Sequence, residues 1–195
     1  MHSFSKLPKN SKMLHALPGT FLLAGGALRD PNFARSVILL CEHNEDGSFG
    51  LVLNRPLPIS LADGFSRITD WDTALFKGGP VQTSSLSFIH TRSDIDIDSQ
   101  ELVPGVFWGG SFERVDELMC KGVVQPDEFR FFAGYSGWGE SQLQGEIDRN
   151  DWYLTPADAE SIFLQNSAEH WSRIMRRIGP EYALFANLPL NPQHN

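Results

Sequence analysis

One short segment of the sequence combines three side chains that could carry chemistry together. Cys41, Glu42 and His43 bring a thiol, a carboxylate and an imidazole into three consecutive positions. A nearby imidazolium lowers the pKa of a thiol and makes it a nucleophile. On a regular strand, however, Cys41 and His43 share a face about 6.6 Å apart, so a dyad would need a β-bulge or another histidine. Two interpretations stay open: a thiol-dependent enzyme or redox sensor using Cys41, and a buried, inert cysteine, which the usual burial of free cysteine favours.

Polar and glycine residues elsewhere in the chain could extend this segment into a pocket. Asn54 lies on the predicted partner strand, and Gly78-Gly79 follows another predicted strand. The segment 136–138 joins a strand to a predicted helix and would add backbone N–H groups and an indole. The predicted pocket consists of Cys41, His43, Asn54, Gly78, Gly79, Ser136, Gly137 and Trp138. Because Arg35 and Arg55 are the only cations expected nearby, a small neutral or weakly anionic ligand fits better than a phosphate-rich one.

Several other kinds of site are excluded by spacing. The run Asp94-Ile95-Asp96-Ile97-Asp98 begins like a calcium loop, but Ser99 and Gly105 stand where such a loop has glycine and glutamate. Neither a CxxC nor an HExxH motif occurs, and no glycine-rich loop has phosphate-binding spacing. We therefore predict no metal site and no cofactor, and the sequence names no catalytic residue.

Composition restricts the partners. The 195 residues are 41% hydrophobic and 21% charged, with a net charge of −8. Such acidity disfavours direct nucleic-acid binding, and we interpret the basic cluster Arg173, Arg176 and Arg177 as a solvated helix face. Cys41 and Cys120 show no pairing pattern, which is typical of a reducing cytoplasm, and we predict a cytoplasmic location. The apolar stretch 16–24 is too short to span a bilayer, so no membrane association is expected.

Hydrophobic patterning predicts one compact domain of α/β (α+β-like) class, with a mixed sheet, a central hairpin and flanking helices. Residues 1–18 are predicted to form a flexible arm, 19–186 the domain and 187–195 a loose tail. The hairpin joins strands at 36–42 and 49–54 through a turn at Asp46-Gly47. The unbroken apolar run 37–41 indicates a strand covered on both faces.

Four helices are predicted after residue 110, at 111–121, 139–148, 155–165 and 167–178. In the third, Thr155 would cap the helix and Pro156 would occupy its first position. In the fourth, one apolar stripe recurs at helical spacing and should pack inward; it consists of Trp171, Ile174, Met175 and Ile178.

Taken together, several segments resemble the signatures of the bacterial YqgE/AlgH family. They are 19–24, 30–43, 47–56, 78–81, 134–138, and Gln142-Leu143 with Glu146 and Trp152. The resemblance spans roughly residues 19–178, departing from many members at 24–27, where these often carry a Met-Pro or similar pair. It implies a compact α/β domain without a recognisable DNA-binding motif. It also implies a role that the family label describes as transcriptional regulation, with no settled biochemical activity. We therefore expect a regulatory protein that acts by binding a small molecule or protein partner, neither of which the sequence identifies.

Overall fold

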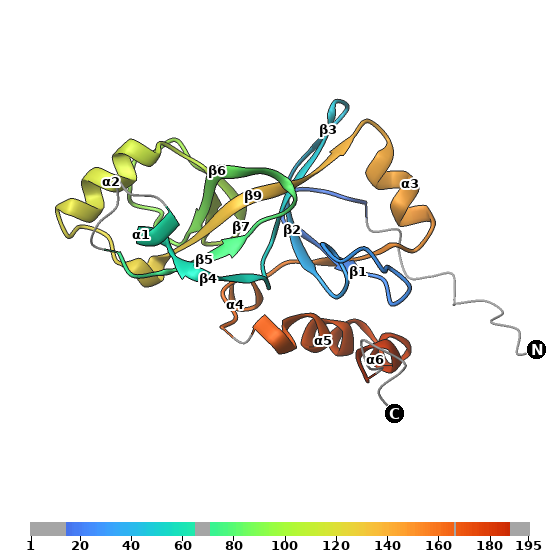
Figure 1. Cartoon of the computed structure of the whole chain (residues 1–195). Coiled ribbons are helices and arrows are strands. Elements are labelled where there is room, and N and C mark those ends of the chain that lie inside the picture. The colour runs from blue at the N-terminus through green and yellow to red at the C-terminus, as the bar shows by residue number, and fades with distance from the viewer. Residues whose placement is uncertain (1–14, 65–70, 166, 188–195) are drawn as a thin grey trace, which may run out of the picture.

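A long curled sheet organises the domain in the computed structural model, which describes residues 15–64, 71–165 and 167–187 (Figure 1). Its order is β10-β1-β2-β3-β9-β6-β8-β7; β5 joins β9 as a parallel neighbour, and β4 pairs with β5. The strands are β1 (Thr20–Ala24), β2 (Val37–Asn44), β3 (Gly47–Val52), β4 (Pro56–Ser60), β5 (Ala74–Lys77), β6 (Val81–His90), β7 (Gln100–Val103), β8 (Val106–Trp108), β9 (Phe129–Gly139) and β10 (Trp152–Pro156). This mixture of helices with a mostly antiparallel sheet confirms the α+β expectation.

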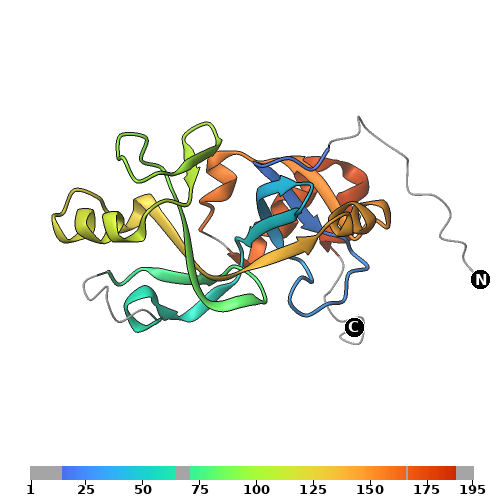
Figure 2. The same cartoon turned by 90° about the horizontal axis from the view of Figure 1, so that it is seen from above.

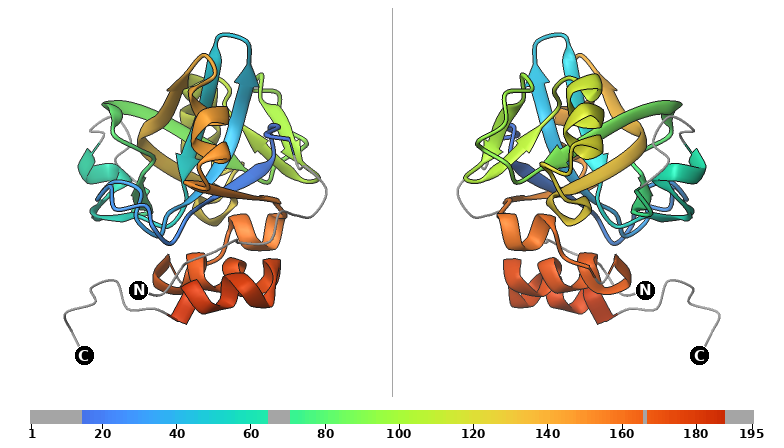
Figure 3. Two further views of the ribbon diagram at one scale, coloured as in Figure 1. Left: turned by 90° about the vertical axis from the view of Figure 1, so that its right-hand side faces the viewer. Right: turned by 90° about the vertical axis from the view of Figure 1, so that its left-hand side faces the viewer.

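Helices cover the outside of the sheet. They are α1 (Leu61–Gly64), α2 (Phe112–Cys120), α3 (Gln142–Asp148), α4 (Ala159–Ile162), α5 (Ser167–Ile178) and α6 (Pro180–Asn187), with a 3-10 turn at Pro126–Glu128. Figures 2 and 3 show α2 and α3 at opposite ends of the sheet, with α4, α5 and α6 together along one side. Within the described residues, no helix is long and apolar enough to cross a membrane.

Alternation along β1 and β2 divides the core around the hairpin into two faces. Leu39 and Cys41 point into the α5-side core, which contains Phe21, Leu23, Leu51, Trp171, Ile174 and Met175 among others. Ile38 and Leu40 point into the α3-side core, which contains Leu22, Val52, Trp138, Leu143 and Trp152. The residues 37–41 are fully buried, and β2 and β3 are flanked by β1 and β9. The predicted central hairpin, covered on both faces, is confirmed.

The turn of this hairpin differs from the prediction. Asn44 Oδ1 accepts hydrogen bonds from the backbone N–H groups of Asp46 (2.9 Å) and Gly47 (3.2 Å), and Gly47 is already paired with Asn44 as the first residue of β3. The loop is therefore Glu45-Asp46 rather than Asp46-Gly47, because the asparagine side chain fixes the turn one residue earlier. A β-bulge between Leu40 and Glu42 then shifts the register.

The helix predicted at 155–165 begins at a different residue in the structure, whereas the helix predicted at 167–178 buries the face that was predicted. Thr155 and Pro156 do not start a helix: they belong to β10 and pair with β1. The short α4 instead starts after Asp158, whose Oδ1 accepts from Ser161 N at 2.8 Å. In α5 the predicted stripe does pack inward, with Trp171, Ile174 and Met175 buried and Ile178 partly buried. The predicted arm and tail fall largely outside the described residues.

Candidate functional site

The Cys41 side chain is sealed inside the protein. It has no exposed surface, packs in the α5-side core, and its Sγ donates to Leu39 O at 3.5 Å. Burial raises the pKa of the Cys41 thiol well above its usual range, and the Glu42 carboxylate adds to the rise. His43 is exposed on the hairpin and its Nδ1 hydrogen-bonds Ser48 Oγ at 2.8 Å. The structure therefore holds this thiol neutral, with no hydrogen bond to the nearby imidazole.

Trp138 lies on the other face of the sheet from Cys41. Its Nε1 donates to Glu146 Oε2 at 2.8 Å, and the same oxygen accepts from Trp152 Nε1 at 2.7 Å. Gln142 Nε2 donates to the second oxygen of Glu146 at 2.9 Å. One carboxylate thus satisfies two indoles and ties α3 to β9 and β10, which gives Gln142, Glu146 and Trp152 a structural role.

The glycines of the predicted pocket allow strands to approach closely. Gly78 accepts from Val52 N at 2.9 Å and from Ser136 Oγ at 3.2 Å. A Cβ at Gly78 or Gly79 would clash with the backbone of β9. Ser136 is a buried residue of β9, where a helix entry was predicted, and Gly137 is exposed on the same strand. Gly78, Gly79 and Ser136 therefore meet, but within packed backbone.

The eight predicted residues consequently do not surround one cavity among the described residues. Cys41 and Trp138 belong to cores on opposite faces of the sheet, since successive strand residues point to opposite sides. Asn54 takes part in a third arrangement, as a buried tether. Its Oδ1 accepts from Val37 N at 3.0 Å and its Nδ2 donates to Arg35 O at 2.9 Å. The hydrogen bond from Asn54 Nδ2 to Arg35 O holds Arg35 in a left-handed backbone conformation with φ of 57°. This conformation is costly for a residue other than glycine.

Next to Asn54, two cations meet in an arrangement that the sequence did not reveal. We call Asn32, Ala34, Arg55 and Lys77 the basic corner. Pro56 pairs with Phe76, and Lys77 N donates to Arg55 O at 2.8 Å, so the two cationic residues are cross-strand neighbours. The Arg55 guanidinium donates to Ala34 O, and Lys77 Nζ donates to Asn32 Oδ1 at 2.9 Å.

The basic corner lacks compensating negative charge. Among the described residues, no carboxylate oxygen lies within 4.0 Å of the Arg55 or Lys77 side-chain nitrogens, and both residues are half-buried. Burial lowers the pKa of Arg55 from its usual value. Like charges at directly opposed strand positions destabilise a sheet. In a chain of net charge −8, the two cationic side chains thus have carbonyl and amide partners but no carboxylate partner among the described residues.

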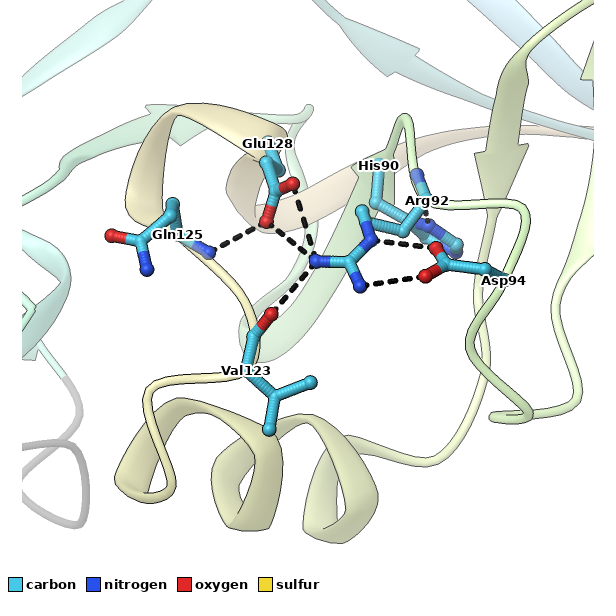
Figure 4. Close-up of polar contacts among 6 residues, drawn as sticks. All are labelled: His90, Arg92, Asp94, Val123, Gln125 and Glu128. Carbon is cyan, nitrogen blue, oxygen red and sulfur yellow. Dashed lines mark hydrogen bonds and ion pairs between the residues drawn. The ribbon is translucent and has the colours of Figure 1, made fainter.

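A second charged cluster, around Arg92, is structural (Figure 4). Arg92 donates to both oxygens of Asp94, at 2.7 and 2.9 Å, to Val123 O at 2.9 Å, and to Glu128 at 3.1 Å. These bonds fasten the end of β6 to the segment before β9. Asp94 is thereby occupied, and the described part of the chain contains no group of histidine, cysteine or acidic residues that could hold a metal ion.

A family model described as AlgH-like (DUF179) matches residues 21–183. The chain belongs to the AlgH-like family. The UPF0301 protein of Chlorobaculum parvum is 42% identical over 177 residues, which cover 91% of this chain and 95% of the relative. The UPF0301 protein of Chlorobaculum tepidum is also 42% identical, with the same coverage.

Two solved structures share the fold. The crystal structure of a Corynebacterium diphtheriae protein superimposes with a TM-score of 0.77 at 25% identity, covering 91% of this chain and 95% of the other. The solution structure of the AlgH protein from Pseudomonas aeruginosa gives a TM-score of 0.69 at 30% identity, covering 92% and 100%. The resemblance to the AlgH family is confirmed.

Two AlgH-like segments and the residue just before a third meet at the basic corner. The segment 30–35 supplies Asn32 and Ala34, the segment 54–56 supplies Arg55, and Lys77 directly precedes the segment 78–81. Sequence reasoning named Arg55 as a nearby cation and missed Lys77. The position of Lys77 next to Gly78, a residue of the predicted pocket, could have drawn attention to it. Only the pairing of β4 with β5 shows that Lys77 lies opposite Arg55.

Because Cys41 is sealed in this AlgH-like domain, we expect its alkylation by iodoacetamide at pH 8 to be at least about a hundredfold slower than that of Cys120. Cys120 is exposed at the end of α2 and serves as the internal comparison. Peptide mass spectrometry over time measures both rates, and labelling of Cys41 should become fast in urea. Equal rates in native buffer would contradict the burial of the thiol.

Proposed function

We propose that this AlgH-like protein is a regulatory binding protein rather than an enzyme, and that it binds a small oxyanion at the basic corner. The observation that carries the proposal is the pair Arg55 and Lys77, opposed across two strands with no carboxylate partner among the described residues. A carboxylate or phosphate group would supply the missing negative charge and accept hydrogen bonds from both side chains. Asn32 adds a side-chain amide at the same place.

Regulation of transcription, which the family label suggests, would then be indirect. The net charge of −8 opposes contact with nucleic-acid phosphates. Two arginines of the basic cluster on α5 are engaged by acids, Arg173 with Glu160 and Arg177 with Asp158. These observations support a protein that responds to a ligand or protein partner. The thiol-dependent alternative gains no support, because Cys41 has neither exposure nor a hydrogen-bonded base.

Inorganic phosphate is the simplest probe of the basic corner. We expect it to raise the Tm saturably above the Tm in sodium chloride of equal ionic strength. At ten times Kd, ligand binding adds about 1.4 kcal/mol of stability, or roughly 3–5 °C for a chain of this size. Sodium acetate in place of phosphate distinguishes a carboxylate from a phosphate preference. Differential scanning fluorimetry provides the measurement.

Two variants separate binding from structure. Arg55→Gln combined with Lys77→Gln should abolish the anion-dependent shift, whereas Lys121→Gln on the exposed end of α2 should retain it. Without added anion, Lys77→Gln alone should change the free energy of unfolding by less than about 1 kcal/mol, since it removes one of two facing cationic residues together with a single part-buried hydrogen bond to Asn32. A full phosphate shift in the double variant would overturn the proposal.

A further inference from the structure

A cavity of about 310 Å³ lies between α4 and α5 and shares no lining residue with the basic corner. Figure 1 shows these two helices next to each other beneath the sheet. The lining residues are Glu160, Ser161, Leu164, Arg173, Ile174 and Arg177. Its volume is at the lower end of the range for small-molecule sites, and its wall combines a few polar groups with two aliphatic side chains.

Two arginines one helical turn apart form the polar wall. Arg173 Nη2 lies 3.2 Å from Glu160 Oε1. Arg177 Nη1 lies 2.8 Å from Asp158 Oδ2 and donates to Ser161 Oγ at 2.9 Å. Each guanidinium has five N–H donors, so most of them have no partner among the described residues. Glu160 is 83% exposed, and its single contact with Arg173 is therefore of the weakly held surface type.

A buried positive charge lies behind this wall. Arg130 is 4% exposed, and its guanidinium donates to the carbonyls of Ile162 (2.7 Å) and Leu164 (3.3 Å), at the end of α4. It also lies over the rings of Phe76 and Phe163. Its hydrogen-bond acceptors are carbonyl oxygens, and among the described residues it forms no ion pair within 4.0 Å.

The charges around the cavity therefore leave a positive excess. Arg173 and Arg177 are balanced by Glu160 and Asp158, while Arg130 is balanced by dipoles alone. His170 lies one turn before Ile174 on α5, and its pKa is lowered to about 4 by burial first and by the charges of Arg130 and Arg173, against the raising effects of the Ser161 backbone and the Asp158 charge. An anion entering the cavity would meet the two half-exposed guanidinium groups of Arg173 and Arg177, with the buried charge of Arg130 behind them.

We infer that the α4–α5 cavity binds a small carboxylic acid with an apolar body. The carboxylate would accept from the unused N–H groups of Arg173 and Arg177, whose planar forks match its geometry. Leu164 and Ile174 would contact the hydrocarbon part of the ligand. An inorganic anion has no such part, so these two side chains favour an organic acid. The exposed Glu160 would give up its contact with Arg173 when the ligand enters. This site is independent of the oxyanion site proposed at the basic corner.

Hexanoate is a suitable probe, with hexanamide as the neutral counterpart of equal length. We expect saturable hexanoate binding with a Kd of roughly a millimolar, which is usual for so small a ligand. In ¹H–¹⁵N correlation spectra of the full chain, the shifts should concentrate on α4 and α5. Hexanamide should bind at least tenfold more weakly, because it lacks the charge that the two guanidinium groups recognise.

Substitution of the two arginines tests whether hexanoate occupies this cavity. Arg173→Gln combined with Arg177→Gln should weaken hexanoate binding at least tenfold while the remaining spectrum shows an intact fold. Arg114→Gln is the matched control, since Arg114 is equally exposed and has one carboxylate partner on α2. Arg55→Gln with Lys77→Gln should leave the hexanoate-induced shifts on α4 and α5 unchanged, because a carboxylate bound at the basic corner would shift β4 and β5 instead. Failure at one site is therefore distinguishable from failure at the other. Equal affinity for hexanamide, or unchanged binding in the Arg173/Arg177 variant, would overturn the inference.

Discussion

We expect the free energy of unfolding to fall steeply as the pH drops from 6.5 toward 4. Two histidines, His90 and His170, have no exposed surface. Burial lowers the pKa of each to about 4, from an ordinary value of 6.5. His90 lies between the rings of Phe107 and Phe129, and neither ring nitrogen of His170 has a hydrogen-bond partner among the described residues.

The direction of the effect follows from proton uptake. Above pH 6.5 both histidines are neutral in the folded and the unfolded chain, so their contribution to stability is fully present. Between pH 6.5 and about 4 only the unfolded chain binds the two protons, and stability declines by up to about 1.4 kcal/mol per pH unit for each histidine. Below pH 4 the folded histidines titrate as well. Hydrogen bonds to Ser60 and Arg92 lower the pKa values of Asp63 and Asp94, which places their effect below this window.

Urea unfolding at pH 7.5, 6.0, 5.0 and 4.5 measures the slope. His90→Phe keeps the aromatic stack with Phe107 and Phe129 while removing one titrating group, so the slope should fall by about half. His170→Leu should have the same effect, and the double variant should be nearly flat across this range. His43→Gln, on the exposed hairpin, should follow the wild type. An unchanged slope in both single variants would contradict the assignment.

Local patterning was sufficient where burial follows directly from residue spacing. The unbroken apolar run 37–41 predicted a strand buried on both faces, and its side chains indeed alternate between two cores. The spacing of Trp171, Ile174 and Met175 likewise predicted the inward face of α5. In both cases burial depends on a single strand or helix. The spacing of hydrophobic residues along that element is therefore enough to predict which side chains are buried.

Patterning failed where distant pairing competes with a local signal. Thr155-Pro156 has the composition of a helix start, yet the pairing of β10 with β1 extends the strand through both residues. The candidate pocket failed for a related reason. Cys41 and Trp138 have suitable chemistry, but the face on which each lies depends on strand register and on a β-bulge. The basic corner was missed because the adjacency of Arg55 and Lys77 exists only through the β4–β5 register.

Replacement of Trp171 by alanine should cause the largest loss of stability of any substitution in α5. Its indole is 3% exposed in the α5-side core, its Nε1 donates to Ala24 O at 3.0 Å, and the Arg35 guanidinium lies 5.3 Å from the ring centroid. Removing a buried tryptophan costs about 3–5 kcal/mol, or a fall in Tm of roughly 10 °C for a chain of this size. Trp171→Phe, which keeps most of the ring and loses the hydrogen bond, should cost clearly less, and Ser172→Ala on the same helix should cost little. Chemical denaturation at pH 7.5, where the buried histidines are neutral in both states, isolates the packing effect. A loss below about 1 kcal/mol for Trp171→Ala would mean that this face of α5 contributes to partner binding instead of to the core.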